Sequence, residues 1–125
     1  MTAWRHAPLL DDAVAAQLRA DLEADEVAEI LAAFAADIHS RADDLAAALA
    51  AGDADGARRA AHSLKGAALN LGRSRLGLIC AYFQHAGLAE IAALWPEFAA
   101  LCDATLAAQG QTGLAFGEDS SIVRA

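Results

Sequence analysis

The sequence lacks the segments that mark secreted, membrane-spanning or nucleotide-binding chains. No long apolar run precedes the first acidic residues, so a secretory signal is not expected. No uncharged apolar stretch is long enough to cross a bilayer. Strand-like alternation, internal repeats and a glycine-rich phosphate loop are all absent from the sequence. We therefore expect a soluble, cytoplasmic protein.

Basic residues and cysteines are also scarce. The chain has 9 lysines and arginines against 17 acidic residues, which gives a formal net charge of −8. This charge argues against binding to nucleic acid or to an anionic membrane surface. The two cysteines, Cys80 and Cys102, have no metal-type CxxC spacing. We interpret them as buried free thiols of a reducing compartment.

Helix-forming residues dominate the composition of the chain. Alanine is the commonest residue, and it favours helices strongly while burying little area. Apolar residues recur by threes and fours in five segments, at about 11–20, 25–52, 54–71, 73–86 and a last one that ends near 110. Pro96 lies inside the last pattern, so this helix is expected either to kink there or to begin close to Trp95.

These segments predict an all-α fold. Asp25 and Asp53 are the expected N-caps of the second and third helices. Short connections force sequential helices to reverse direction, so we expect an antiparallel up-down-up-down four-helix bundle with a short N-terminal capping helix. A chain of 125 residues has room for one domain. We assign it to residues 1–110 and expect a flexible tail at 111–125.

His62 stands apart from the apolar seam of the third segment. The seam recurs at helical spacing through Ala57, Ala61, Leu64, Ala68 and Leu71. At about 100° per residue, His62 lies roughly 140° from this seam and should face solvent. Its sector contains positive charge, one small residue and one apolar residue, contributed by Arg58, Lys65, Gly66, Leu69 and Arg73. Taken alone, an exposed histidine near a lysine is more often incidental than functional.

Positive charge is concentrated around His62 although the chain is acidic. Of the 9 basic residues, five fall within positions 58–75. We interpret Arg58, Arg59 and Arg73 as partner-binding residues, with ordinary solvated positions as the alternative. Exposed Leu69 would form an apolar docking patch beside them. Gly66 lowers helix stability relative to alanine, which indicates that another surface must approach closely there.

The run AAHSLKGAALNLG, at 60–72, resembles the signature of histidine phosphotransfer (HPt) domains. In that signature a histidine is followed by lysine at the third position and by glycine at the fourth and tenth. His62, Lys65, Gly66 and Gly72 match these positions. A fourth helix that closes with Phe83 and Gln84 also fits the family, and the resemblance covers about 22–106.

The resemblance implies a role in a phosphorelay. His62 would accept a phosphoryl group on Nε2 from an aspartyl phosphate in the receiver domain of a hybrid histidine kinase, and would pass it to the aspartate of a response regulator. Lys65 would screen the phosphoryl charge. Gln84 would orient the ring or bond the phosphoryl oxygens, although a solvated amide is an equally good reading. The chain would need no cofactor of its own, because the receiver brings Mg²⁺.

Three alternative functions have less support in the sequence. A helical adaptor that binds a partner without being phosphorylated is the main alternative. A histidine kinase is excluded by the short length, the lack of a nucleotide site and the lack of an acidic residue after His62. A metal site from His39, His62, His85 and carboxylates is not supported, because the sequence has no Glu-x-x-His pair. His6 is expected in a frayed N-terminus. We also expect a monomer, because the seams face inward and the net charge is high.

Overall fold

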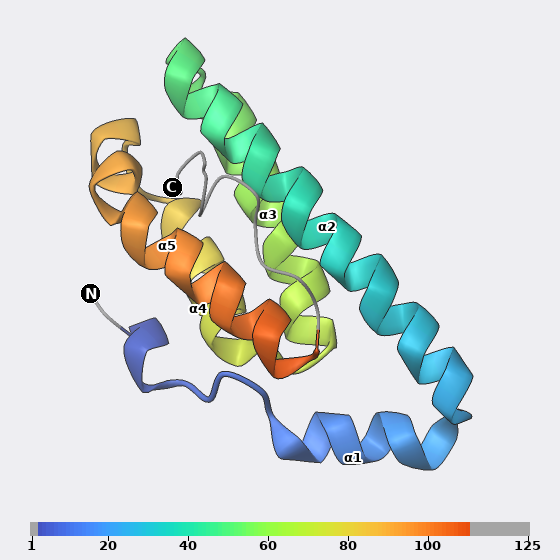
Figure 1. Ribbon diagram of the computed structural model, residues 1–125. Helices are drawn as coiled ribbons and strands as arrows, with labels where there is room; N and C mark the ends of the chain where they lie inside the picture. The colour runs from blue at the N-terminus through green and yellow to red at the C-terminus, as the bar shows by residue number, and fades with distance from the viewer. Residues whose placement is uncertain (1–2, 111–125) are drawn as a thin grey trace.

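The structure is a computed structural model that describes residues 3–110, and these residues form helices without a strand. The elements, shown in Figure 1, are η1 (Ala3–His6), α1 (Asp12–Asp21), α2 (Ala24–Ala51), α3 (Ala54–Asn70), α4 (Ser74–Phe83) and α5 (Leu88–Ala108). The all-α prediction is therefore confirmed. The predicted tail at 111–125 lies outside the described residues.

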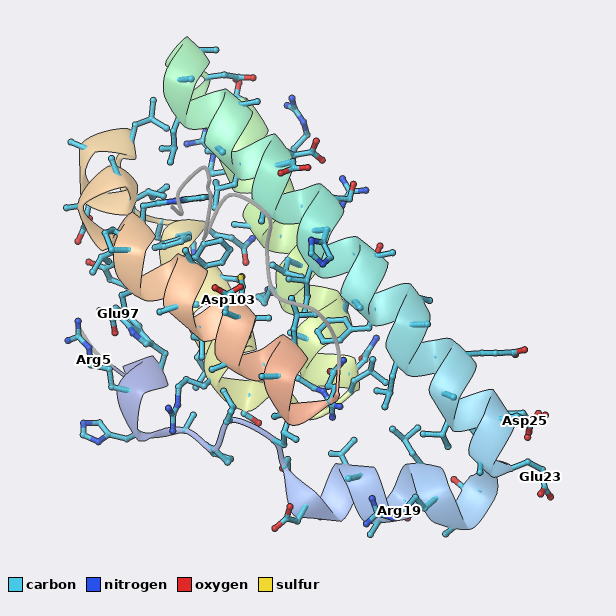
Figure 2. All side chains as sticks on the ribbon, viewed as in Figure 1. Arg5, Arg19, Glu23, Asp25, Glu97 and Asp103 are labelled. Carbon is cyan, nitrogen blue, oxygen red and sulfur yellow. The ribbon has the colours of Figure 1, made fainter. Side chains whose placement is uncertain are left out.

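The ends of α2 and α3 follow from local hydrogen bonds and from one glycine. The Asp53 side chain accepts a bond from the Gly56 N–H at 2.9 Å and so caps α3 as predicted. The prediction for α2 is wrong, because Glu23 and not Asp25 is its N-cap. Glu23 and Glu26 form a reciprocal capping box, and Asp25 lies within the first turn, at the corner labelled in Figure 2. Helix α2 ends where Gly52 adopts a φ of 70°.

The last two helices differ from their expected bounds. Helix α4 ends at Phe83, three residues earlier than predicted, and Gly87 is the N-cap of α5. The alternative in which the last helix begins near Trp95 is wrong, because α5 is helical from Leu88 and contains Pro96. Proline removes one backbone donor from the helix. Burial of Ile91 before Pro96 and of Phe98 after it holds both halves against the core.

The core lies where α2, α3, α4 and α5 meet. Helix α3 packs between α2 and α4, and α5 contacts both α4 and α2. The aromatic rings of Phe83 and Phe98 are fully buried, with centroids 5.5 Å apart. Cys80 and Cys102 are buried free thiols, as predicted, and burial raises the pKa of both.

Helix α5 is the one helix within residues 3–110 that is long and apolar enough to cross a membrane by length and composition. Core helices of soluble proteins pass the same test. Its apolar face is occupied within the molecule, since Phe98, Cys102 and Leu106 are fully buried. About a third of its most apolar window is buried, so core packing accounts for part of the apolar character of α5.

The N-terminal segment is attached to the helices, so the expectation that it is frayed is wrong for residues 3–6. Trp4 is 2% exposed and its ring centroid lies 5.0 Å from that of Tyr82 on α4. The indole N–H donates to Glu97 on α5 at 2.9 Å, and Arg5 donates to the same carboxylate at 2.7 Å. The Arg5 and Glu97 side chains point toward each other in Figure 2. These bonds lower the pKa of Glu97 to about 2.

Candidate functional site

His62 lies on the solvent-facing side of α3. The apolar residues on the opposite side are buried against α2 and α4, and they include Ala57, Ala61, Leu64 and Ala68. His62 itself is exposed, as the helical periodicity predicts. The imidazole is therefore accessible to a partner while the backbone beneath it is fixed by core packing.

Gln84 fixes one ring nitrogen of His62. It is half-buried at the end of α4, and its Nε2 lies 3.0 Å from Nδ1 of His62. Close packing of α4 on α3 makes this contact, and fully buried Phe83 holds the preceding residue in the core. Three interpretations were left open for Gln84, and the one in which it orients the ring has this direct contact in its favour. The amide nitrogen can only donate, so Nδ1 is the acceptor in this contact and the proton of the neutral ring is on Nε2, the nitrogen that does not contact Gln84.

Lys65 and Gly66 lie one turn from His62 on the same helix. Lys65 is half-buried and forms no ion pair with another described residue, so its ammonium is not neutralised by a carboxylate within residues 3–110. Gly66 is exposed, and a Cβ placed on it would meet no atom within 4 Å. The fold therefore has space for a side chain at position 66. A surface glycine that internal packing does not require is consistent with close approach from outside.

At position 72, the other glycine of the motif, the structure itself requires a glycine. Its φ is 76°, and an added Cβ would lie 2.7 Å from Cβ of Val14 on α1. Its carbonyl also accepts a hydrogen bond from the Asp11 N–H at 2.7 Å. The two motif glycines thus differ: Gly66 leaves a surface open, whereas Gly72 allows α3 to end against the start of α1.

Leu69 is the single large hydrophobic residue that is exposed among the described residues, with 43% of its surface accessible. It lies two turns after His62 on the same side of α3. Its side chain packs on the backbone of α4 at Gly77, where an added Cβ would lie 2.7 Å from Cγ of Leu69. Gly77 is not among the residues predicted from the sequence. A glycine inside an apolar helix was the available signal for a close helix contact.

Arg58 and Arg59 lie on the surface before His62. Arg58 forms an ion pair with Asp55, one turn earlier on α3. Arg59 lines a polar hollow of about 320 Å³ between α2 and α3, together with Arg41, Asp44 and Ser63. Both arginines are exposed, so both remain available as partner-binding residues.

Arg73 does not lie on the exposed face, and the expectation that placed it there is wrong. It is 3% exposed, and its guanidinium donates to Oε1 of Gln109 at 2.7 Å and to the Leu71 carbonyl at 2.8 Å. Helix α3 ends at Asn70, so Arg73 no longer follows the helical spacing that relates it to His62. Burial lowers the pKa of Arg73.

The remaining histidines and acidic residues form no metal site within residues 3–110. His39 is half-buried on α2, and His6 and His85 are exposed. The arrangement at His62 instead combines an accessible imidazole, an amide that orients it, and a lysine one turn away. Such a group can attack an electrophilic phosphorus and hold the transferred group beside a positive charge.

The comparisons with known proteins agree with this geometry. No curated protein and no solved structure matches the chain. The family model described as the Hpt domain matches residues 29–111, which is more than half of the chain and contains all four motif positions. This chain belongs to the Hpt domain family.

Proposed function

We propose that the chain is a phosphorelay carrier in which His62 is the phosphoacceptor. It takes a phosphoryl group from an aspartyl phosphate in the receiver domain of a hybrid histidine kinase and passes it to a response regulator. Membership of the Hpt family supports the phosphotransfer role in general. The observation that carries the residue assignment is the exposed imidazole whose Nδ1 lies 3.0 Å from Gln84.

The transfer requires a lone pair on Nε2 of His62. Neutral imidazole has one protonated nitrogen, so Nε2 is nucleophilic when the proton is on Nδ1. The N–P bond forms as the bond from phosphorus to the aspartate oxygen breaks, and the ring then carries a positive charge until Nδ1 loses its proton. The structure has the amide nitrogen of Gln84 at Nδ1, which favours the other tautomer. The nucleophilic tautomer forms when the amide makes a half-turn, so that its oxygen accepts a hydrogen bond from Nδ1–H. After the proton leaves, a half-turn of the amide lets its N–H group donate to Nδ1.

Lys65 and the surface around it would act on the phosphoryl group and on docking. The transition state spreads charge over the equatorial oxygens, so a nearby cation stabilises it. Gly66 would let the receiver approach the imidazole, and Leu69 would supply the apolar centre of the contact. Arg58 and Arg59 would form the charged rim. The receiver would supply Mg²⁺ and its own acidic pocket, so the carrier would need no cofactor.

The proposal also covers the helix topology, the oligomeric state and the cellular location of the protein. Helix α2 contacts α3, α3 contacts α4, α4 contacts α5, and α5 contacts α2. This cyclic order supports an antiparallel up-down-up-down bundle. Inward-facing seams and a net charge of −8 favour a monomer that meets receivers in transient complexes. We place the protein in the cytoplasm, where buried free thiols are kept reduced.

Incubation with a panel of phosphorylated receiver domains tests the proposal. Label should move to the chain and should be acid-labile and alkali-stable, as a phosphoramidate is. His62→Gln should abolish labelling and keep the helical content, whereas His85→Gln should be labelled like the wild type. Label that persists in His62→Gln would place the phosphoacceptor elsewhere. A chain that binds receivers without acquiring label would instead be the helical adaptor.

A further inference from the structure

A cavity of about 240 Å³ lies between α1, the first turns of α2 and the end of α5, away from the exposed face of α3. Apolar side chains of α1 and α2 line it, among them Leu18, Val27 and Leu31. Its polar lining consists of Arg73, Gln109 and the exposed Arg19, which is labelled on α1 in Figure 2. No acidic residue within the described part of the chain lines it.

Arg73 contributes a buried positive charge to this cavity. Its two hydrogen-bond acceptors, the Gln109 amide oxygen and the Leu71 carbonyl, are both neutral. Within residues 3–110 it forms no ion pair with a carboxylate. A guanidinium has five N–H donors, and two of them are used in these bonds; no Arg73 nitrogen is both buried and unpaired. Burying a cation is costly without an anion beside it, so the surroundings of Arg73 favour a negatively charged partner.

Gln109 provides a second, independent observation. Its Oε1 accepts the bond from Arg73, which fixes the opposite end of the amide as a donor. That nitrogen, Nε2, is buried and has no hydrogen-bond partner. Buried polar groups are normally paired. The unpaired Nε2 of Gln109 and the guanidinium of Arg73 lie side by side, and together they could donate to the two oxygens of one carboxylate.

We propose that this cavity binds a small organic acid. Its carboxylate would take hydrogen bonds from Arg73 and from Nε2 of Gln109, and Arg19 would add a second positive charge. Its alkyl body would lie against Leu18 and Leu31. An aspartate or glutamate side chain of a protein partner is a poorer candidate, because it has too little apolar surface to cover the leucine and valine side chains that line the cavity. Drug-sized ligands occupy pockets of about 300–1,000 Å³, so a short aliphatic acid suits this smaller volume.

Titration of the ¹⁵N-labelled full chain with hexanoate, and separately with hexanamide, tests this inference. The two probes have similar shape, but only the first is charged. Hexanoate should shift the side-chain signals of Gln109 Nε2 and Arg73 Nε saturably. Hexanamide should bind at least about tenfold more weakly, because hydrogen bonds to ionised groups are the stronger ones. Equal shifts with both probes, or none with hexanoate, would overturn the proposal.

Three variants complete the test. Arg73→Met should abolish the response to hexanoate, provided that circular dichroism shows a folded chain. Gln109→Leu leaves Arg73 in place and should weaken binding several-fold, so it decides the matter if Arg73→Met does not fold. Arg41→Ala, in the separate polar hollow between α2 and α3, should bind like the wild type. Unchanged hexanoate affinity in Gln109→Leu would contradict the assignment. None of these outcomes depends on phosphotransfer at His62.

Discussion

Gln84, at the end of α4, places its amide nitrogen 3.0 Å from Nδ1 of His62 on α3. The contact joins two helices and fixes the orientation of a ring that is otherwise exposed to solvent. Either end of the amide can face Nδ1, and the end that does so selects the ring nitrogen that keeps the proton. In the proposed relay, the reactivity of His62 would therefore be coupled to the position of α4.

Replacement of Gln84 measures this coupling. We expect Gln84→Ala to slow transfer by about fivefold, because a hydrogen bond between neutral groups contributes about 1 kcal/mol. Single-turnover labelling from a phosphorylated receiver gives the rate, and ¹⁵N shifts of the His62 ring report the tautomer. His85→Ala, at the adjacent exposed position, is the control. An unchanged rate and tautomer in Gln84→Ala would remove Gln84 from the mechanism.

Lys65 should affect rate without affecting the fold. Lys65→Ala removes a positive charge near the phosphoryl group, and we expect transfer to slow by about tenfold or more. Since Lys65 forms no ion pair with a described residue, the free energy of unfolding should change by about 0.5 kcal/mol or less. Rate and chemical denaturation are measured on the same preparation. A large loss of stability would mean that the lysine has a structural role.

The two motif glycines should respond oppositely to substitution by alanine. Gly66→Ala should stabilise the protein by about 0.5–1 kcal/mol, because position 66 is helical and an added Cβ meets nothing within 4 Å. Gly72→Ala should destabilise it, because φ is 76° and the new Cβ would overlap Val14. Chemical denaturation separates the two.

The larger substitution Gly66→Gln tests receiver approach. It should retain the folded stability of Gly66→Ala and yet block labelling by receivers, because its side chain projects over the imidazole surface. Phosphoramidate, a small donor, should still label His62 in this variant. Normal transfer from receivers to Gly66→Gln would show that close approach at this position is not needed.

The helical spacing within α3 was enough to predict the exposed face. The spacing places His62 opposite the apolar seam, and Asp53 is a recognisable N-cap, because both kinds of signal depend on local geometry. The same helical spacing predicted the wrong position for Arg73. The helix ends at Asn70 and Gly72 turns the chain with a positive φ, so the next residue points into the molecule.

Contacts between distant segments were not readable from local patterns. Trp4 lies in a four-residue element with no measurable periodicity, and its burial depends on the surfaces of α4 and α5. The approach of Leu69 to Gly77 likewise exists only once α3 and α4 are packed. Family resemblance indicated Gln84, but the orientation of its amide toward Nδ1 required the packed helices.

The ion pair that holds the N-terminus gives the last prediction, which concerns pH. Hydrogen bonds from Arg5 and then Trp4 lower the pKa of Glu97 from 4.5 to about 2. A carboxylate whose pKa is lower in the folded state stabilises that state at pH values above its unfolded pKa. The contribution should therefore be complete above about pH 4.5 and should disappear as the pH falls through about 2.

Comparison of the wild type with Glu97→Gln isolates this contribution. The difference in free energy of unfolding between the two should be constant near neutral pH and should shrink steadily as the pH falls below about 4.5. The indole N–H signal of Trp4 should differ between the two proteins at neutral pH, because the amide cannot accept as a charged group does. Glu29→Gln, at an exposed position on α2, should show no such pH-dependent difference. A difference for Glu97→Gln that persists unchanged to pH 2 would mean that the carboxylate charge does not hold η1 against α5, and that burial of the Trp4 ring is sufficient.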